Sequence, residues 1–483
     1  MKAFFIFSIF IVFSLNSSNL IEASKDSSEE RDDKSKGCKV DLKTSFSETS
    51  PLLIQNEKLY QPKIKDKNLI FSQNEMIEMY CEEWTNFVDN NNEPLKGSVI
   101  AICENDNNFL IQSQNTNFPF EELKCKNLPK FTRKQTITNC YNEDNDAVLH
   151  EIGYQIDNNR FLSLYESCFN GHRTWYTKYT IDKYWNNFVK FTRPLVFEND
   201  IFDMQKNYFS ANVQKENLGK IFSGNLPSEI QELYKNGGFF NRGHLAASSD
   251  FIFPSNKNLT FHLINVAPQW KNFNEGNWVR IETATANYAA RKSRDLTTYT
   301  GTYGVINFKA YGVDKDFYLG DSILPVPMLY YRIIINRNKG VVFLGLNDPF
   351  PTNTNDIENY KICQDISDKY SWDKSFDAWN MHRQNISRGY SYACELNEFL
   401  DIVQISDIKQ VSGVLGVIRK DHFRKNSIII ICVAVILTLT AGISLLFCLN
   451  RRKKWLNCCS SKPLELKTTN NYDRLVEDHE QHI

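Results

Sequence analysis

The chain has 483 residues, enough for one large domain with appendages or for two or three domains of average size. Its formal net charge of −1 excludes recognition of a polyanion through overall charge, so any such site has to be a local basic patch. Hydrophobic residues make up 42% of the chain and aromatic residues 13%, which is sufficient for a substantial buried core.

The N-terminus has the pattern of a secretory signal peptide. Lys2 precedes an apolar run from Ala3 to Leu15, and small residues follow between positions 17 and 24. Because the run is too short to span a bilayer comfortably, we expect residues 1–24 to direct export; a buried N-terminal strand is the alternative. The charged, polar stretch that follows predicts a flexible N-terminal segment over residues 25–79.

Residues 80–410 are predicted to form one mixed α+β domain, with a separate N-terminal subregion before about residue 150 as the alternative. This part has many aromatic and β-branched segments, no internal repeat, and no linker rich in Pro, Gly or Ser. Strands are predicted at Gly97–Ile102, Phe161–Tyr165, Tyr330–Ile335 and Gly340–Gly345. A helix is predicted over residues 274–290, where apolar side chains recur near one face.

Cysteines and sequons agree with an exported domain. Eight cysteines precede the second apolar run, and an even number in an oxidising compartment indicates disulfides. Cys363 and Cys394 stand apart from the others and are candidates to pair, while the remaining connectivity stays open. Asn258 and Asn385 begin Asn-X-Ser/Thr sequons and are candidate glycosylation sites, although such sequons also arise by chance in an Asn-rich chain.

His244 is the strongest candidate for a catalytic residue. A neutral imidazole can take a proton from water near physiological pH, although a structural histidine is the commoner alternative. Arg242 shares a face with His244 if this stretch is a strand, and a guanidinium can hold a phosphate through two parallel hydrogen bonds. Gly243 between them would allow close approach of a ligand to the backbone.

Two residues further along the chain could serve a cation. Asn274 offers a neutral amide oxygen, which suits a hard ion such as Mg2+ that keeps several of its waters. Glu282 lies two helical turns later, about 80° round the helix, and could orient a water or a neighbouring group. An ordinary helix cap at Asn274 and a solvated face at Glu282 are the structural alternatives.

A second apolar run predicts a transmembrane helix over residues 427–449. Residues 427–450 contain no charge, and Arg451-Arg452-Lys453-Lys454 follow at once. Since the more basic flank stays in the cytoplasm, we expect a single-pass type I membrane protein with its main domain extracellular or lumenal; a core helix is the alternative. In the predicted cytoplasmic tail, residues 450–483, Tyr472 and Leu475 form a candidate sorting motif for clathrin adaptors, which would place the protein at the cell surface, in endosomes or in lysosomes.

Taken together, the motifs resemble those of the DNA/RNA non-specific endonuclease family, the ββα-metal nucleases related to endonuclease G. The resemblance rests on Asn241-Arg242-Gly243-His244, Leu263–Gln269, and Asn274–Trp278 with Glu282, in this order and spacing. Details such as Asn277-Trp278 look most like secreted invertebrate DNases. The resemblance covers roughly residues 80–410, and it implies a central antiparallel sheet with a ββα-metal finger and activity on DNA, RNA or both.

The resemblance also implies roles for individual residues. The general base falls on His244 and the ligand for Mg2+, or for Mn2+ in its place, falls on Asn274. Arg242 and Glu282 fall on catalytic positions, and Asn241 and Asn265 on positions that support the substrate or the metal.

Two positions depart from the family pattern. Many members have Asp where this chain has Asn241, and the loss of a carboxylate there could weaken metal binding. Some bacterial members have Arg at the position of Ala286, so another cation has to serve, for which Arg280, Arg291 and Lys292 are candidates. A catalytically weak or inactive nucleic-acid receptor is therefore the alternative to a membrane-anchored nuclease, and an adhesion or scaffold ectodomain is a third hypothesis. The sequence does not indicate the oligomeric state.

Overall fold

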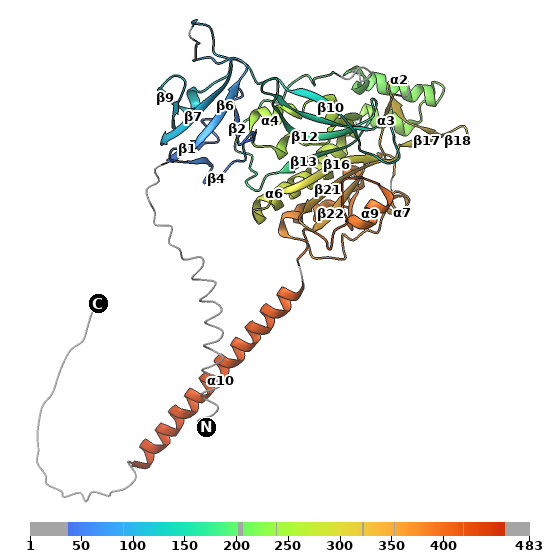
Figure 1. Cartoon of the computed structure of the whole chain (residues 1–483). Coiled ribbons are helices and arrows are strands. Elements are labelled where there is room, and N and C mark those ends of the chain that lie inside the picture. The colour runs from blue at the N-terminus through green and yellow to red at the C-terminus, as the bar shows by residue number, and fades with distance from the viewer. Residues whose placement is uncertain are drawn as a thin grey trace, which may run out of the picture. The chain divides into compact units, whose positions relative to one another are not determined.

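The computed structural model describes residues 37–89, 91–200, 206–237, 239–320, 323–351, 353–418 and 420–458. Two compact units are distinguished, the first ending at Ile418 and the second beginning at Arg419. The predicted signal peptide, residues 1–24, and the motif at Tyr472 and Leu475 lie outside the described residues. The mixed α+β class with a large antiparallel sheet is confirmed (Figure 1).

Residues 37–126, here called the N-terminal subdomain, form small sheets around a core of their own. One sheet has the order β3-β2-β6-β7-β8-β9 and the other the order β1-β5-β4. The bounds are β1 Gly37–Asp41, β2 Leu52–Gln55, β3 Lys58–Leu59, β4 Ile64–Lys65, β5 Asn68–Ser72, β6 Met76–Cys81, β7 Gly97–Asn105, β8 Asn108–Ile111 and β9 Thr116–Pro119. Disulfides Cys38–Cys103 and Cys81–Cys125 lie within this subdomain.

The folded N-terminal subdomain differs from the flexible segment predicted over residues 25–79. From Gly37 onward the chain forms paired strands, and Val40, Leu69 and Phe71 are buried in their core. Each of these short strands contributes few apolar side chains, so local composition does not reveal the core that forms when they pair. The two disulfides add the constraint that such a small β-structure needs.

The central sheet has eight antiparallel strands in the order β10-β11-β12-β13-β16-β21-β22-β23. Their bounds are β10 Thr132–Asn139, β11 Val148–Gln155, β12 Phe161–Phe169, β13 Thr174–Ile181, β16 Leu296–Tyr303, β21 Leu329–Asn336, β22 Lys339–Leu346 and β23 Ser391–Cys394. The four predicted strands correspond to β7, β12, β21 and β22. In β21 and β22 almost every side chain is buried, which explains their nearly continuous apolar sequences.

The chain between β13 and β16 carries the ββα element. Strand β14 (Phe240–His244) pairs antiparallel with β15 (Val266–Trp270), so that His244 lies opposite Val266. After α5 (Lys271–Phe273) and one irregular turn, helix α6 runs from Val279 to Lys292. Helices α2 (Ala211–Ile221) and α3 (Ser228–Lys235) precede β14 in the chain, and α4 (Pro254–Leu259) lies between β14 and β15. Strands β17 Asn307–Ala310, β18 Val313–Asp316, β19 Tyr318–Leu319 and β20 Leu324–Pro325 follow β16, and helices α7 Thr354–Glu358, α8 Asp377–His382 and α9 Leu396–Ile402 lie near the end of the unit.

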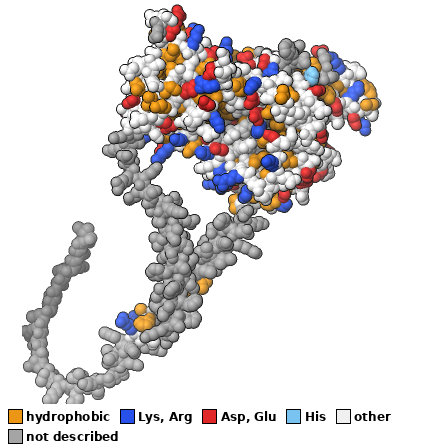
Figure 2. Space-filling model, viewed as in Figure 1, with side chains coloured by type: hydrophobic (Ala, Val, Ile, Leu, Met, Phe, Trp, Pro, Cys, Tyr) orange, Lys and Arg blue, Asp and Glu red, His pale blue; other side chains and the backbone are white. Residues whose placement is uncertain are grey.

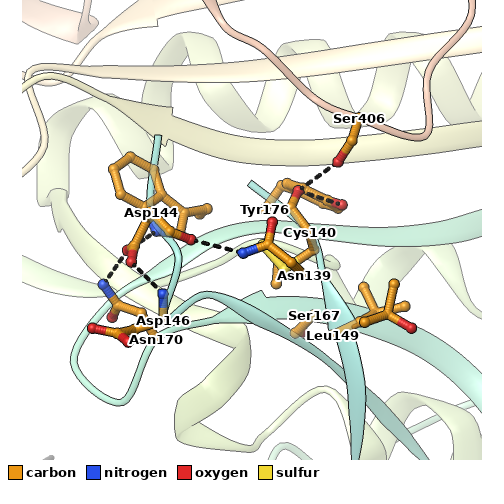
Figure 3. The surroundings of a disulfide bond; sticks show 12 residues. Asn139, Cys140, Asp144, Asp146, Leu149, Ser167, Asn170, Tyr176 and Ser406 are labelled. Atoms are coloured by element: carbon orange, nitrogen blue, oxygen red, sulfur yellow. Dashed lines mark hydrogen bonds between the residues drawn. A yellow bond between two sulfur atoms is a disulfide. The ribbon is translucent and has the colours of Figure 1, made fainter. Parts of the chain in front are cut away.

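The disulfide Cys140–Cys168 fastens the turn after β10 to β12 (Figure 3). In the same turn the Asp144 carboxylate accepts hydrogen bonds from Asn170 Nδ2 at 2.6 Å and Trp175 Nε1 at 2.8 Å. Ser406 Oγ donates to the Cys140 carbonyl at 3.3 Å, which ties the end of the first unit to the sheet. The fourth disulfide joins Cys363 to Cys394, as predicted.

The second unit is described for one long helix, α10 (Lys420–Cys458). Within the described residues, Val433–Arg452 is one stretch that is long and apolar enough to cross a membrane, with a mean hydropathy of 2.2. It overlaps the transmembrane helix predicted at 427–449. On the face of the first unit seen in Figure 2, acidic and basic side chains are interspersed, in keeping with the small net charge.

Candidate active site

Strand β14 and the start of α6 bring the predicted site residues to one cleft of about 1120 Å³. Asn241, Arg242 and His244 reach it from β14, and Asn274 and Glu282 reach it from the helical side. Five of the six residues assigned to catalysis, substrate and metal therefore line one concave surface. The sequence separates these two groups by 30 residues, and pairing of β14 with β15 closes that distance.

The helix that carries Asn274 and Glu282 begins irregularly. Residues 274–278 form a π-helical turn, inside which Gly276 leaves helical geometry with φ −108° and ψ −113°. A Cβ atom on Gly276 would lie 2.7 Å from the Arg388 carbonyl oxygen, so this close approach needs glycine. Such interruptions are frequent at functional sites, and here the interruption alters the angular offset expected between Asn274 and Glu282. The regular helix predicted over residues 274–290 therefore forms only from Val279.

Aromatic packing fixes this irregular turn. Phe273 and Trp278 are fully buried, and their rings lie 6.0 and 5.4 Å from that of Tyr330 on β21. Asn277, also fully buried, donates from Nδ2 to the Gly389 carbonyl at 2.6 Å. The start of the helix is thus held from the central sheet on one side and from the loop before β23 on the other.

His244 sits between two aromatic rings. The centroid of its imidazole lies 4.8 Å from that of Phe261 and 5.2 Å from that of Phe197. Among the described residues, no group hydrogen-bonds its buried Nε2. Burial, together with the positive charge of Arg193, lowers the pKa of His244 to about 3, so that the ring is neutral at physiological pH.

Gly243 faces the protein core, and this corrects the expectation that it allows a ligand to approach. An added Cβ would lie 2.5 Å from the Cβ of Gln269 and 2.6 Å from the Tyr330 hydroxyl oxygen. Gly243 lies on the opposite face of the strand from Arg242 and His244, where Gln269 and Tyr330 fill the space beside its Cα.

We therefore expect Gly243→Ala to lower the free energy of unfolding by about 1–3 kcal/mol, because a methyl group would be forced into a packed interface. The measurement is denaturant unfolding followed by tryptophan fluorescence. Gly219→Ala on α2 is the matched control, since a Cβ there has open space around it. Equal unfolding free energies of Gly243→Ala and wild type would show that Gln269 and Tyr330 can shift to accommodate the added methyl group.

Asn265 does not line the cleft but fixes the backbone beside His244. Its side chain is fully buried, accepts a hydrogen bond from Ala246 N at 2.7 Å and donates to the Ala246 carbonyl at 2.9 Å. A further bond reaches the Thr260 carbonyl at 3.0 Å. The segment that follows His244 is thereby held against the turn that leads into β15.

A buried ionic network that the sequence did not reveal lies beside Glu282. The Arg332 guanidinium on β21 is fully buried and pairs with Asp250 at 2.7 Å. It also donates to Tyr179 OH at 2.7 Å and to Thr285 Oγ1 on α6 at 3.0 Å. Burial raises the pKa of Glu282 to about 8, while the positive charge of Arg332 opposes this shift. The network joins the segment after His244, helix α6 and the central sheet.

The three cations proposed to replace an arginine at position 286 lie elsewhere. Ala286 is buried, and Arg291 and Lys292 both pair with Asp373. Arg280 donates to Asn277 Oδ1 at 3.5 Å. Position 286 is therefore buried in packed protein, and none of these three cations is among the residues that line the cleft.

Other basic side chains line the cleft. They are Lys190, Arg193, Arg242 and Lys257, of which only Arg242 was identified from the sequence. Arg193 acts on both His244 and Glu282 through its charge. The Arg242 guanidinium lies 5.1 Å from the ring centroid of Phe209 and 5.5 Å from that of Phe197. Because the net charge of the chain is small, recognition of a polyanion requires a local basic patch, and these side chains form one.

Oxygen donors in the same cleft suit a hard cation. Asn241 and Asn274 offer amide oxygens, Glu275 offers a carboxylate, and Glu282, whose raised pKa favours the protonated form, offers a carboxyl oxygen. Mg2+, Mn2+ and Ca2+ prefer such oxygens to nitrogen or sulfur. Residues of this kind fit a divalent ion bound by few protein ligands.

The two sequons differ in exposure. Asn385 is exposed, and its amide oxygen accepts a hydrogen bond from Ser387 Oγ at 2.8 Å. Asn258 is half-buried, and Thr260, the third residue of its sequon, is fully buried.

Comparison with known proteins gives a family match and several relatives. Residues 143–399 match the model of the DNA/RNA non-specific endonuclease family. A salivary endonuclease of Lutzomyia longipalpis is 26% identical over 305 residues, which cover 62% of this chain and 71% of that protein. Salivary protein Tsal2A of Glossina morsitans morsitans is 23% identical over 391 residues, which cover 75% and 90%. Among solved structures, a complex of EndoG with EndoGI matches at 19% identity and a TM-score of 0.27, covering 41% of this chain and 80% of that one.

Proposed function

Because the chain belongs to the DNA/RNA non-specific endonuclease family and is a nuclease, we propose that it hydrolyses internal phosphodiester bonds of DNA, RNA or both with His244 as the general base and Mg2+ as the metal. The observation that carries the proposal is the convergence of His244, Arg242, Asn274 and Glu282 on one cleft. Members of this family generally depend on a divalent metal ion.

His244 would take the proton from the attacking water. Its depressed pKa keeps the imidazole neutral from pH 5 to 8, so the proton-accepting form is always present in that range. The rings of Phe197 and Phe261 limit how far the imidazole can turn, and Nε2 has no hydrogen-bond partner among the described residues that would compete for the proton. As the water oxygen bonds to phosphorus, the bond from phosphorus to the 3′ oxygen breaks, and that oxygen takes a proton from a solvent water, which leaves a 5′-phosphate and a 3′-hydroxyl.

Asn274 would hold the metal ion through its amide oxygen, with Glu282 and Asn241 orienting the surrounding waters. A bound Mg2+ supplies positive charge that stabilises the transition state and the leaving oxygen. The positive charges of Arg242 and Arg193 would bind the substrate phosphate and offset its charge. Arg193 takes the place of the cation that position 286 lacks.

The metal assignment predicts a specific phenotype for Asn274→Ala. We expect the Mg2+ concentration for half-maximal cleavage to rise about ten- to hundredfold, because an oxygen that positions the ion is lost. The measurement is plasmid cleavage by the full chain in detergent, titrated with Mg2+ after chelation. Asn287→Ala, an exposed position on the same helix, is the matched control. An unchanged Mg2+ requirement in Asn274→Ala would show that other residues hold the metal ion.

The compartment and anchoring follow from other parts of the chain. Four disulfides indicate that the first unit folds in an extracellular or lumenal space. Residues 1–24 would direct export, α10 would anchor the chain once in the membrane, and Asn385 would be glycosylated.

The basic side of the predicted span would place Tyr472 and Leu475 in the cytoplasm, where they would bind a clathrin adaptor. On this account Tyr472→Ala increases the fraction of the protein that surface biotinylation labels. An equal labelled fraction in wild type and variant would show that Tyr472 does not act in sorting, and it would not affect the assignment of nuclease activity.

A further inference from the structure

One wall of the cleft is a seven-residue segment, Asn187–Arg193, which leads from β13 toward the site. The N-terminal subdomain holds this segment in place. Val189 is 3% exposed and belongs to the core of that subdomain, and the Glu48 carboxylate accepts a hydrogen bond from Thr192 N at 2.8 Å. On the other side, the buried Lys257 donates from Nζ to the Val189 carbonyl at 3.2 Å.

Anchoring of Val189 turns its two neighbours outward. Phe188 is 37% exposed and Lys190 is also exposed, and both line the cleft. The Lys67 ammonium, from the N-terminal subdomain, lies 5.6 Å from the centroid of the Phe188 ring. An accessible aromatic ring thus lies in the same cleft as His244, with the Lys67 ammonium over the ring and the exposed Lys190 two residues further along the chain.

This combination has a clear physical counterpart in nucleic acids. A base presents a flat face that stacks on an aromatic ring whatever its sequence, and the phosphates on either side pair with lysine. A cleft of about 1120 Å³ also has room for more than the reacting phosphate. A ring that served only to pack the protein would be covered by neighbours, as Phe46 and Phe253 are where the subdomain meets the rest of the unit.

We propose that Phe188 is a stacking platform for a nucleobase next to the scissile phosphate, with Lys67 and Lys190 beside the adjoining phosphates. The proposal rests on the nuclease function proposed above and assigns a substrate-binding role to the N-terminal subdomain, which lies before the residues that match the family model. The subsite adds affinity for a nucleotide without adding to the chemistry at phosphorus.

The test uses the full chain in detergent with two kinds of substrate. Phe188→Ala is expected to raise KM for a single-stranded oligonucleotide about tenfold with kcat nearly unchanged, because stacking is lost. For methyl p-nitrophenyl phosphate, which has no base, kcat/KM is expected to stay the same. Phe188→Trp is expected to restore the wild-type KM, and Tyr311→Ala, an exposed aromatic residue outside the cleft, is the matched control.

Binding to a catalytically blocked protein identifies the contact itself. In the His244→Ala background, Phe188→Ala is expected to weaken binding of a normal oligonucleotide but not of one whose bases are all replaced by abasic residues. Equal losses with both oligonucleotides, or no loss with either, would overturn the stacking subsite while cleavage by wild type continued. Failure of wild type to cleave either substrate would instead overturn the nuclease proposal.

Discussion

His244→Ala is expected to lower kcat for plasmid cleavage by about a thousandfold, the largest effect of any single change in this protein. The imidazole lines the cleft, is neutral at physiological pH, and has a buried Nε2 that no described group hydrogen-bonds. On the proposed mechanism, loss of the ring removes the group that accepts the proton from water, while Asn274, Arg193 and Arg242 remain in the cleft. The measurement is the rate of supercoiled plasmid nicking at saturating Mg2+.

Two controls separate this effect from a loss of folding. The unfolding free energy of His244→Ala has to remain close to that of wild type, and His382→Ala, at an exposed position on α8, has to retain full activity. Residual cleavage within tenfold of wild type would show that another group accepts the proton.

Arg332→Met is expected to have the largest effect on stability. The Arg332 guanidinium is fully buried and bonds to Asp250, Tyr179 and Thr285. Removal of one partner leaves the Asp250 carboxylate buried without its counter-ion, which costs about 3–5 kcal/mol of unfolding free energy. Because Thr285 lies on α6, we also expect cleavage to fall through displacement of the helix that carries Glu282.

A double-mutant cycle tests the ionic origin of this effect. Asp250→Asn combined with Arg332→Met is expected to be less destabilising than the sum of the two single changes, because each single change leaves one isolated buried charge and the double variant leaves none. Arg383, a second arginine with little exposure, pairs with Asp368 at the surface, and Arg383→Met is the comparison for loss of a less buried pair. Strict additivity of the first pair would mean that the two residues contribute independently.

The predictable part of the site was local in sequence. Arg242 and His244 alternate along one strand, and Asn274 and Glu282 lie on one helical segment, so short-range periodicity is enough to group each pair. Their meeting in one cleft followed from resemblance to a family, because the pairing of β14 with β15 leaves no distinctive local signal. The regular-helix prediction missed the π turn at Asn274, which depends on the close approach of Gly276 to Arg388.

Residues that act through tertiary contacts were not predictable in the same way. Arg193 lies about 50 residues before His244, in a segment whose sequence has no periodic pattern. Its position beside the cleft depends on the burial of Val189 in the N-terminal subdomain, which is a tertiary contact. Arg332 lies in an otherwise apolar strand, and a charged side chain there would ordinarily predict an exposed position. Its burial is explained by the ion pair with Asp250, which the sequence does not reveal. The core of residues 37–79 was not predicted because each strand has few apolar side chains, and these form a core only when the strands pair.

The N-terminal subdomain supports one wall of the cleft that contains His244. It lies outside the residues that match the family model, yet it carries Lys67 and fixes the wall that bears Phe188 and Arg193. A chain that lost this subdomain would keep His244 and Asn274 but would lose the support of one side of the cleft.

Cleavage of plasmid DNA and of RNA by the purified full chain, with Mg2+ and with chelator, from pH 5 to 8, tests directly whether the protein is a metal-dependent nuclease. We expect internal cuts with Mg2+, none after chelation, and products that carry 5′-phosphates. Because His244 stays neutral throughout this range, its protonation should not abolish cleavage at pH 5. A protein that binds nucleic acid but never cuts it under any of these conditions would contradict the account and would identify a receptor with the fold of a nuclease.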